Sequence, residues 1–379
     1  MGKKVLLGMS GGVDSSVSAA LLLEQGYEVV GAFMKNWSDE RFGGCTWKKD
    51  RRDAMRVAAQ LGIRFVTYDF EEDYRNHVVQ YMFDEINRGR TPNPDVMCNK
   101  YIKFDRLVQE ADKLGCDYIA TGHYAKIDNC LSLRGGSEPV EGPTKQSFRL
   151  RRLLRPKGLA MTDAMCIYEP TDKNKDQTYF LWAITREVVP RILFPLGNLT
   201  KPEVRKIAVE LNLTTAEKQD STGVCFIGEI NMDDFLSENI PEDPGDVITT
   251  DGKVIGKHKG INFYTIGQRH GLDIAGVQPY YVISKNQKTK ELIVSSNYDQ
   301  QLYQSDLSAG QSNWFANIRA PFECKARIRY RQELQNCTIT KIKGDQVSVT
   351  FEKPQRAVTP GQSIVLYNNE MMLGGAVIE

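Results

Sequence analysis

The stretch GMSGGVDSS, Gly8–Ser16, constrains the fold of this chain more than any other segment. An apolar run, Lys4–Met9, leads into it, and a stretch with helical periodicity, Val17–Gln25, follows and ends at Gly26. Two adjacent glycines between a strand and a helix let backbone N–H groups approach an anion, and the positive end of the helix dipole points to the same place. The sequence therefore predicts a phosphate-binding loop between a strand and a helix.

Strand and helix signals keep alternating beyond this loop. Further strands are expected at Glu28–Met34, Arg64–Phe70 and Asp117–Ala120. Helices are expected at Asp50–Leu61, Asp73–Arg88, Asn99–Leu114, Gln177–Thr185 and Lys201–Leu211. Parallel strands that alternate with helices are joined by right-handed crossovers, so the expected fold class is α/β with a doubly wound parallel sheet.

Three parts of the chain differ in character. Residues 1–235 carry the alternating pattern, interrupted at 129–176 by a basic, Gly/Pro-punctuated insertion that we interpret as a long loop or hairpin. Residues 236–300 contain turn signals and short β-rich runs, which predict a small β-rich central domain. Residues 301–379 read as short alternating strands without a helix signal, which predicts a C-terminal β-barrel.

Composition limits the possible locations and partners. The formal net charge is +1, so a nucleic-acid partner would have to be recognised by local basic patches. No apolar run approaches the roughly 20 residues that span a bilayer, and strand residues begin by Lys4. We therefore expect a cytoplasmic protein. Most of its eight cysteines are then expected to be reduced thiols packed as small apolar side chains.

The glycine-rich loop is of a particular kind. It lacks the lysine of the Walker A pattern and does not match G-x-G-x-x-G. It resembles the PP-loop, S-G-G-x-D-S, of enzymes that cleave ATP to AMP and pyrophosphate. This resemblance implies that a substrate oxygen becomes adenylated. Asp14, beside a polyanion, would either cap N–H groups or hold Mg²⁺.

Two cysteines lie in unusual surroundings. Cys98 immediately precedes the helix expected from Asn99, where the helix N-terminus and nearby lysines would lower the pKa of its thiol. Cys225 lies in KQDSTGVCFIGE, a polar, glycine-containing stretch that predicts an exposed turn. Together with a PP-loop, two reactive thiols suggest sulfur transfer. Adenylation turns the C2 oxygen of uracil into a leaving group, a persulfide attacks the carbon, and a second thiol accepts the remaining sulfur as a disulfide.

Several segments together resemble one family. They are GMSGGVDSS, MKNW, GRTPNPDVMCNKYIKF, ATGHYAKI, NKDQTYFL, KQDSTGVCFIGE, YTIGQRHGL, RYRQ and TPGQS. In this order they resemble the tRNA-specific 2-thiouridylases, and they cover nearly the whole chain. The resemblance implies ATP- and Mg²⁺-dependent 2-thiolation of the wobble uridine, U34, of lysine, glutamate and glutamine tRNAs. A persulfide donor, such as a cysteine desulfurase or a sulfur-relay protein, would supply the sulfur.

The resemblance also implies roles for individual residues. Cys225 would carry the persulfide, Cys98 would resolve it, and Asp95 would act as acid and base. The implied ATP contacts are Gly8, Met9, Ser10, Gly11, Gly12, Val13, Asp14, Ser15, Met34 and Gly122. The implied tRNA contacts are Asn93, Pro94, Asp95, His123, Lys175, Asp176, Gln177, Arg329, Tyr330 and Gln362. The strand pattern independently puts Met34, Gly122 and His123 at the carboxyl edge of the sheet, where such folds bind ligands.

The segment CKARIRYRQ predicts a surface for nucleic acid. Lys325, Arg327, Arg329 and Arg331 alternate in it, so a strand would present all four on one face, without an acid among them. This arrangement favours contact with phosphates. The basic insertion is longer than usual in the family, and its role stays open.

Two alternatives remain open at this point. A PP-loop synthetase that amidates with ammonia would use the same loop, but it gains nothing from two reactive cysteines. An iron–sulfur-dependent thiolase would use Asp95, Cys98 and Cys225 as cluster ligands and a cluster-bound sulfide in place of the persulfide.

Overall fold

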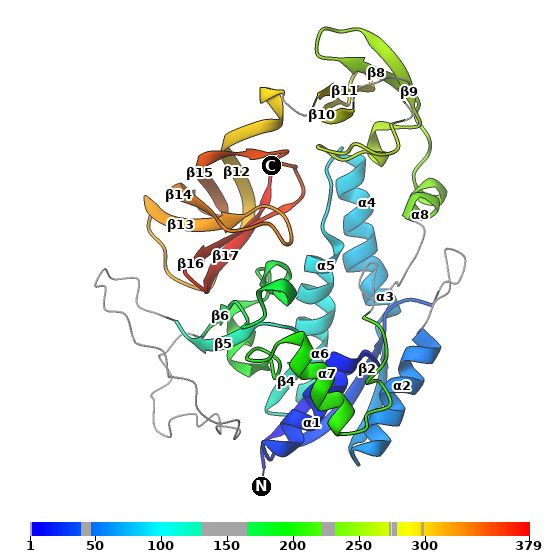
Figure 1. Cartoon of the computed structure of the whole chain (residues 1–379), viewed down its shortest axis with the longest axis vertical. Coiled ribbons are helices and arrows are strands. Elements are labelled where there is room, and N and C mark those ends of the chain that lie inside the picture. The colour runs from blue at the N-terminus through cyan, green and yellow to red at the C-terminus, as the bar shows by residue number, and fades with distance from the viewer. Residues whose placement is uncertain are drawn as a thin grey trace.

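The computed structural model describes residues 2–38, 47–130, 165–220, 232–272, 274, 279–296 and 299–379. These residues form an α/β unit, a small β-sheet and a β-barrel (Figure 1). Cys45, Cys225 and the centre of the basic insertion lie outside the described residues.

A five-stranded sheet forms the centre of the α/β unit. Its strand order is β3-β2-β1-β4-β7 and every neighbouring pair is parallel, which confirms the doubly wound fold class. The strands are β1 Lys4–Gly8, β2 Glu28–Lys35, β3 Arg64–Asp69, β4 Tyr118–Thr121 and β7 Ile192–Leu193. Nothing in the sequence marked β7, because two residues are too few to show a period.

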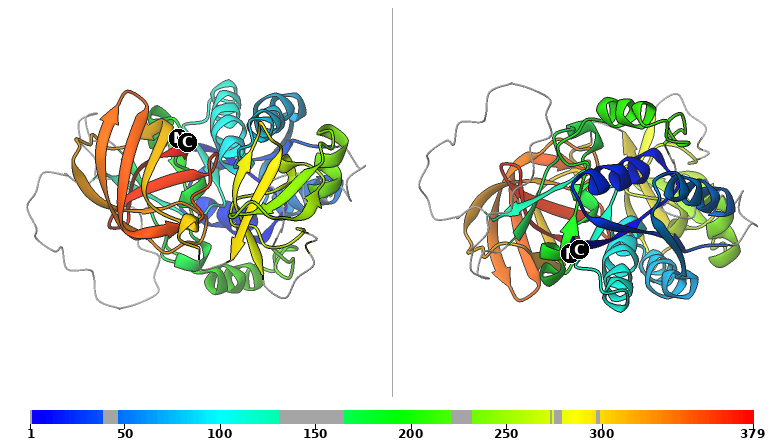
Figure 2. Two further views of the ribbon diagram at one scale, coloured as in Figure 1. Left: turned by 90° about the horizontal axis from the view of Figure 1, so that it is seen from above. Right: turned by 90° about the horizontal axis from the view of Figure 1, so that it is seen from below.

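Helices cover both faces of this sheet (Figure 2). Val5 and Leu7 point into an apolar cluster on one face, whereas Leu6 points into the cluster on the other, as the alternation along a strand requires. The first cluster takes in residues of α1 Val13–Glu24, α2 Trp47–Gln60 and α7 Lys201–Glu210. The second takes in residues of α3 Glu71–Tyr74, η1 Arg75–Val79, α4 Gln80–Asn87, α5 Pro94–Met97, η2 Cys98–Arg106 and α6 Leu107–Lys113.

The two helices expected at Asp73–Arg88 and Asn99–Leu114 each form as a continuous helix with a π-helical middle, η1 and η2. The start expected at Asn99 is wrong, because the second helix begins at Pro94 with Asn93 as its N-cap. Proline suits this first helical position, since its fixed φ matches the helix and its missing N–H would have no partner there.

The helix expected at Gln177–Thr185 is also wrong. A single 3₁₀ turn, η4 Thr178–Phe180, is followed by turns. The side chains of this segment are anchored in the barrel instead: the Tyr179 hydroxyl donates to the Ser363 carbonyl over 3.0 Å, and Trp182 Nε1 donates to Ser363 Oγ over 2.9 Å. Tertiary contacts therefore override the local helical pattern here.

A small four-stranded sheet follows the α/β unit. Its order is β10-β11-β8-β9, with β8 Gly245–Thr249, β9 Val254–His258, β10 Tyr280–Asn286 and β11 Glu291–Ser296. Along the chain, the helix α8 Met232–Asn239 precedes this sheet, and the 3₁₀ turn η6 Ile261–Phe263 lies between β9 and β10. The sheet lies beyond the end of α4 (Figure 1), where Lys285 Nζ donates to the Gly89 carbonyl over 3.2 Å.

The C-terminal strands close into a barrel through the pairing of β12 with β17. The strands are β12 Tyr303–Trp314, β13 Phe322–Arg327, β14 Gln335–Lys343, β15 Gln346–Arg356, β16 Ser363–Asn368 and β17 Met371–Ile378. Short 3₁₀ turns complete the chain at η3 Lys173–Lys175, η5 Arg186–Arg191 and η7 Gln300–Leu302. The expected C-terminal β-barrel is confirmed.

The two ends of the basic insertion form a hairpin of β5 Lys126–Asn129 and β6 Met165–Tyr168. This hairpin extends the barrel sheet, because Tyr168 pairs with Met371 of β17. A disulfide joins Cys130 and Cys166 at the open end of the hairpin. These two are exceptions to the expectation that most of the cysteines are reduced; the strand pairing brings them together over a sequence separation of 36 residues.

Candidate active site

The glycine-rich loop lies between the carboxyl end of β1 and the start of α1, at the middle of the parallel sheet. Gly11 has φ +77°, and a Cβ at this position would lie 2.2 Å from the Asp50 carbonyl oxygen. Only glycine fits this combination of positive φ and close backbone approach. No side chain caps the N-terminus of α1, because Gly12 is its N-cap.

Met34 and Gly122 border this loop. A Cβ at Gly122 would lie 2.9 Å from the Ser15 backbone nitrogen, and a Cβ at Gly8 would lie 3.1 Å from Met34 Cε. The strands β1, β2 and β4 are neighbours, so their carboxyl ends meet here. The residues expected to contact ATP, Gly8–Ser15, Met34 and Gly122, are thus brought together at one edge of the sheet.

Two lysines from distant parts of the chain reach the loop. Lys201 Nζ lies 2.8 Å from both carboxylate oxygens of Asp14, and Lys218 Nζ donates to the Gly11 carbonyl over 3.0 Å. Lys218 also pairs with Asp50 and Asp53 at 2.7 Å. The loop itself has no lysine, and these two place cations against it. Sequence reasoning missed both, although it predicted the helix that begins at Lys201.

The hydroxyl of Tyr124 also bonds to Asp14, donating to Oδ1 over 2.9 Å. Burial, together with the negative charge of Asp14, raises the pKa of Tyr124 well above its usual value. Tyr124 therefore stays protonated and remains a donor. Its backbone N–H donates to Gln177 Oε1 over 3.0 Å, which ties the tRNA-contact candidate Gln177 to the residues behind the loop.

Asp220 joins these groups to the chain that leads toward Cys225. Its carboxylate lies 2.7 Å from Lys201 Nζ and from Lys175 Nζ, and 2.8 Å from Arg205. Burial alone would raise the pKa of Asp220, but the hydrogen bonds from Lys175 and Lys201 outweigh it and lower the pKa to about 2. Asp220 is the last described residue before 221–231, so the role expected of Cys225 falls outside the described residues.

Cys98 lies within the helix and not at its end. The helix begins at Pro94, so Cys98 follows a complete turn and its side chain is fully buried. The first turn, where the dipole acts most strongly, therefore holds Asp95 and not Cys98. Asn99 Nδ2 donates to the Asp95 carbonyl over 2.9 Å, which holds the catalytic candidates Asp95 and Cys98 in one rigid segment.

Other candidates for tRNA contact lie where the barrel meets the loop before α5. Gln362 Nε2 donates to the carbonyls of Thr91 and Pro92 over 3.0 and 3.2 Å, and these two residues immediately precede Asn93. Arg329 donates to the Ala357 carbonyl over 2.8 Å.

Tyr330 packs on Phe180, with ring centroids 4.5 Å apart. Phe180 neighbours Tyr179, whose hydroxyl bonds to the barrel. Gln362 and Tyr330 therefore mark the contact between the barrel and the α/β unit. Arg329 lies near this contact, because Tyr179 acts on it electrostatically, but its hydrogen bonds go to Ala357, Thr359 and Ile266.

His123 and Asp176 occupy buried positions. Thr121 Oγ1 lies 2.7 Å from His123 Nδ1 and Lys103 Nζ lies 3.3 Å from Nε2. Burial, then the charge of Lys103, holds the pKa of His123 well below its usual value, so the ring is neutral near pH 7. Asp176 is 3% exposed and pairs with Arg327 at 3.0 Å.

The predicted basic strand face is wrong. β13 ends at Arg327, and Arg331, at φ +63°, lies in the turn beyond it. Arg327 is buried between the carboxylates of Glu169 and Asp176, which lie before and after η3 and connect this segment to the barrel. A buried cation requires carboxylate partners, so Arg327 is committed inside the protein, whereas Lys325 and Arg331 are exposed.

Family models match nearly all of the chain. The one described as tRNA methyl transferase HUP domain matches residues 3–229, the PRC-barrel domain of the same name matches 233–296, and an aminomethyltransferase beta-barrel domain matches 304–378. The tRNA-specific 2-thiouridylases of Lysinibacillus sphaericus and Staphylococcus carnosus are each 44% identical over 99% of this chain, which covers 94% and 95% of their lengths. The chain belongs to the tRNA-specific 2-thiouridylase family.

Among solved structures, this 2-thiouridylase family member is similar to the U34-tRNA thiolase NcsA from Methanococcus maripaludis. The sequence identity is 18%, the match covers 63% of this chain and 67% of the other, and the TM-score is 0.34. A score this low adds no argument of its own. No helix in the described part of the chain is long and apolar enough to cross a membrane.

Among the described residues, no group of three or more His, Cys, Asp or Glu side chains could hold a metal ion. Cys225 is not among them, so the iron–sulfur alternative stays open.

Proposed function

We propose that the chain catalyses ATP-dependent 2-thiolation of the wobble uridine U34 of tRNA, releasing AMP and pyrophosphate. The observation that carries the proposal is the position of Asp220. Through Lys201, it ties the start of the segment that contains Cys225 to Asp14 of the loop. ATP chemistry and a reactive thiol would thus meet in one site, which an amidating synthetase does not need.

The loop and its lysines would bind ATP. Its glycines and the uncapped start of α1 suit a pyrophosphate group, and Lys201 and Lys218 would neutralise charge that the loop cannot. A Mg²⁺ ion would stabilise negative charge on the pyrophosphate oxygens, and Asp14 is the carboxylate that fits it. Lys201 and Tyr124 hold that carboxylate in this structure, so its partners would rearrange on binding.

The sulfur transfer follows from the two cysteines. The C2 oxygen of uridine attacks the α-phosphorus of ATP and pyrophosphate leaves. The terminal sulfur of a persulfide on Cys225 then attacks C2, and AMP leaves. The Cys98 thiolate attacks Sγ of Cys225 and breaks the S–S bond, so one sulfur stays on the base and a Cys98–Cys225 disulfide forms. Asp95 would move the protons. A dithiol reductant would then return both cysteines to thiols, and a cysteine desulfurase or sulfur-relay protein would reload Cys225 with persulfide sulfur.

The tRNA contacts proposed at Asn93, Pro94 and Asp95 are supported by their place at the start of the helix that carries Cys98. Those at Arg329, Tyr330 and Gln362 are supported by the contact between barrel and α/β unit. Lys175 and Gln177 would act beside the loop. His123 and Asp176 are buried, so direct contact with RNA would require their exposure. We keep the division into 1–235, 236–300 and 301–379, and the cytoplasmic location, as part of this proposal.

A single-turnover assay tests the function. The protein is incubated with tRNA, ATP, Mg²⁺ and a cysteine desulfurase with cysteine as the source of persulfide sulfur, and 2-thiouridine and AMP are quantified. Cys225→Ser should abolish 2-thiouridine while tRNA binding is retained, and Cys98→Ser should do the same. Cys116→Ser is the matched control, because Cys116 is a buried thiol outside the proposed site and should leave thiolation within about twofold.

Unimpaired thiolation by Cys225→Ser would contradict the persulfide role. Iron and acid-labile sulfide in anaerobically purified protein, lost together in the Cys98 and Cys225 variants, would favour the iron–sulfur alternative.

A further inference from the structure

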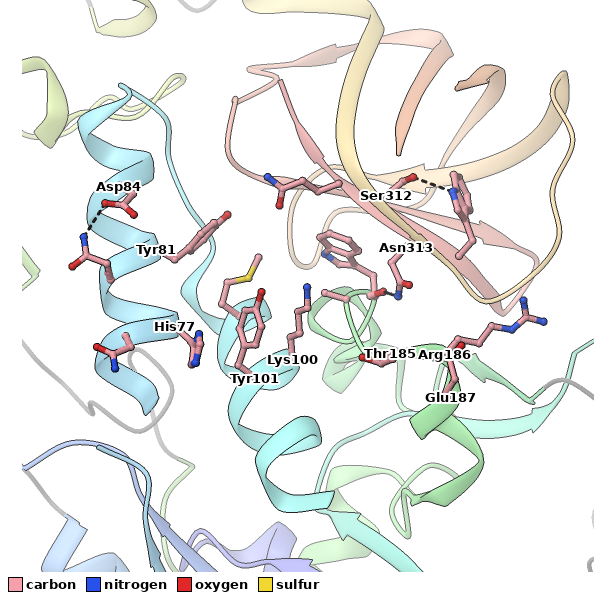
Figure 3. Close-up of a pocket in the computed structure, with 17 residues that line it drawn as sticks. His77, Tyr81, Asp84, Lys100, Tyr101, Thr185, Arg186, Glu187, Ser312 and Asn313 are labelled. Atoms are coloured by element: carbon pink, nitrogen blue, oxygen red, sulfur yellow. Dashed lines mark hydrogen bonds between the residues drawn. The ribbon is translucent and has the colours of Figure 1, made fainter. Parts of the chain in front are cut away.

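A cavity of about 580 Å³ lies between the α/β unit and the barrel (Figure 3). Helical residues of η1, α4 and η2 form one side, and residues 182–187 and 311–314 form the other. Pockets of this size hold small organic groups. None of the residues assigned above to ATP or tRNA lines it.

Aromatic rings and four charged side chains, the cations Lys100 and Arg186 and the carboxylates Asp84 and Glu187, give this cavity its chemistry. The rings of His77 and Tyr101 stack with centroids 4.9 Å apart, and Lys100 Nζ lies 4.8 Å from the centroid of Tyr101. Tyr81 and Trp182 also line the space, and Lys100 lies beside Tyr101 (Figure 3). Lys100 makes no salt bridge within the described part of the chain, so its charge can meet an anion, although Asp84 and Glu187 also line the cavity.

The wall opposite the helices is fixed. Asn313 Nδ2 donates to the carbonyls of Trp182 and Ile184 over 2.6 and 2.8 Å, and Trp182 Nε1 bonds to Ser363 of the barrel. The cavity is therefore held open by hydrogen bonds between barrel and α/β unit. Asn76 and Gln311 add amide groups that can donate and accept at a base edge.

The cavity and Cys98 share one helix. Met97 and Tyr101 line the cavity, and they lie one residue before and three residues after Cys98. The cavity therefore lies beside the turn of the helix that carries Cys98. A strand of RNA that delivers one base to Cys98 would have a neighbouring nucleotide close to this cavity.

We propose that the cavity binds an unpaired nucleotide of the tRNA, next to the uridine that reacts. This inference rests on the proposed function. The aromatic rings would stack the base, an interaction worth about 1–3 kcal/mol per base, and Lys100 would contact its phosphate. A free mononucleotide offers the same chemistry, and the experiment distinguishes the two sources.

The test measures binding of a synthetic anticodon stem-loop RNA by fluorescence anisotropy over a range of salt concentrations. His77→Ala should weaken binding about tenfold without changing the salt dependence, because it removes a ring and no phosphate contact. Lys100→Gln should weaken binding and lower the slope of log Kd against log salt by about one. Lys206→Gln is the matched control: it removes the same charge from a side chain that is 77% exposed on α7 and lies outside the cavity.

The remaining outcomes distinguish a tRNA nucleotide from a free nucleotide as the ligand, and they separate failure of this proposal from failure of the proposed function. Unchanged RNA binding in both cavity variants overturns the proposal. If uridine 5′-monophosphate alone shifts the NMR signals of His77 and RNA binding is unchanged in the variants, the ligand is a free nucleotide and the tRNA assignment is overturned. If the variants weaken RNA binding but the unmodified protein makes no 2-thiouridine, the subsite stands and the proposed function fails.

Discussion

At the scale of single residues, the loop is completed by side chains that its own motif does not contain. Lys201 and Lys218 come from positions about 190 and 205 residues beyond the loop and meet Asp14 and Gly11. The PP-loop motif contains no lysine, but the folded site contains two, which come from distant segments of the chain. Gly11 is the position where the loop is most tightly constrained, since its φ is positive and its neighbour is backbone.

We expect Gly11→Ala to disable the loop. A side chain would have to displace the Asp50 carbonyl, 2.2 Å from the added Cβ, and tolerate a positive φ. Formation of AMP in the presence of tRNA and ATP should fall at least tenfold. Gly26→Ala is the control, because Gly26 also has a positive φ but a Cβ there meets nothing within 4 Å. It should cost about 1 kcal/mol of stability and leave AMP formation intact. Equal AMP formation by both variants would refute the argument.

At the scale of elements, buried charge joins the barrel to the α/β unit. Arg327 at the end of β13 pairs with Glu169 and Asp176, and all three side chains are buried. Lys173 pairs with Glu169 from outside, where its own side chain is 50% exposed. The same carboxylate thus accepts one buried and one exposed partner, which allows a direct comparison.

We expect Arg327→Met to lower the free energy of unfolding by about 3–5 kcal/mol, because it leaves two buried carboxylates without their cation. Lys173→Met should cost about 1 kcal/mol or less, as exposed pairs do. Urea unfolding followed by circular dichroism measures both. A loss below about 1 kcal/mol for Arg327→Met would show that the buried pair does not stabilise the contact between barrel and α/β unit.

At the scale of the whole molecule, a lysine of the small four-stranded sheet contacts the chain just beyond α4. Lys285 on β10 donates to the Gly89 carbonyl, and burial lowers the pKa of Lys285 to about 8. Between about pH 8 and pH 10.5 the unfolded chain binds a proton at this side chain that the folded chain does not. The free energy of unfolding therefore rises with pH across this window. Below the window, the folded protein bears the full cost of keeping the buried lysine protonated.

We expect Lys285→Met to stabilise the protein at pH 7 by at most about 3 kcal/mol, from a pKa difference of about 2.5 at 1.36 kcal/mol per unit. The gain should shrink as the pH rises from 8 toward 10.5. Thermal unfolding at pH 7 and at pH 9.5 measures this. Lys288→Met, an exposed lysine on the same hairpin, should show no such difference. A gain that is equal at both pH values would exclude titration of Lys285 as its cause.

The sequence by itself determined what depends on local pattern. The alternation of strands and helices specified the parallel sheet, the glycines specified the phosphate loop, and the β-rich C-terminus specified the barrel. The strand ends also placed Gly122 and Met34 at the carboxyl edge of the sheet, where such folds bind ligands; the order that makes β1, β2 and β4 neighbours came from the structure.

Only the tertiary structure decided the rest. Long-range packing brought Lys201 and Lys218 to the loop, joined Cys130 to Cys166, and replaced the helix expected at Gln177–Thr185 with turns anchored in the barrel. It also buried Arg327, which the alternating charges had placed on a surface. In each case the deciding partner lies far away in the chain. Local periodicity shows which face of an element is apolar and which is charged. It does not show which distant residues will pack against either face.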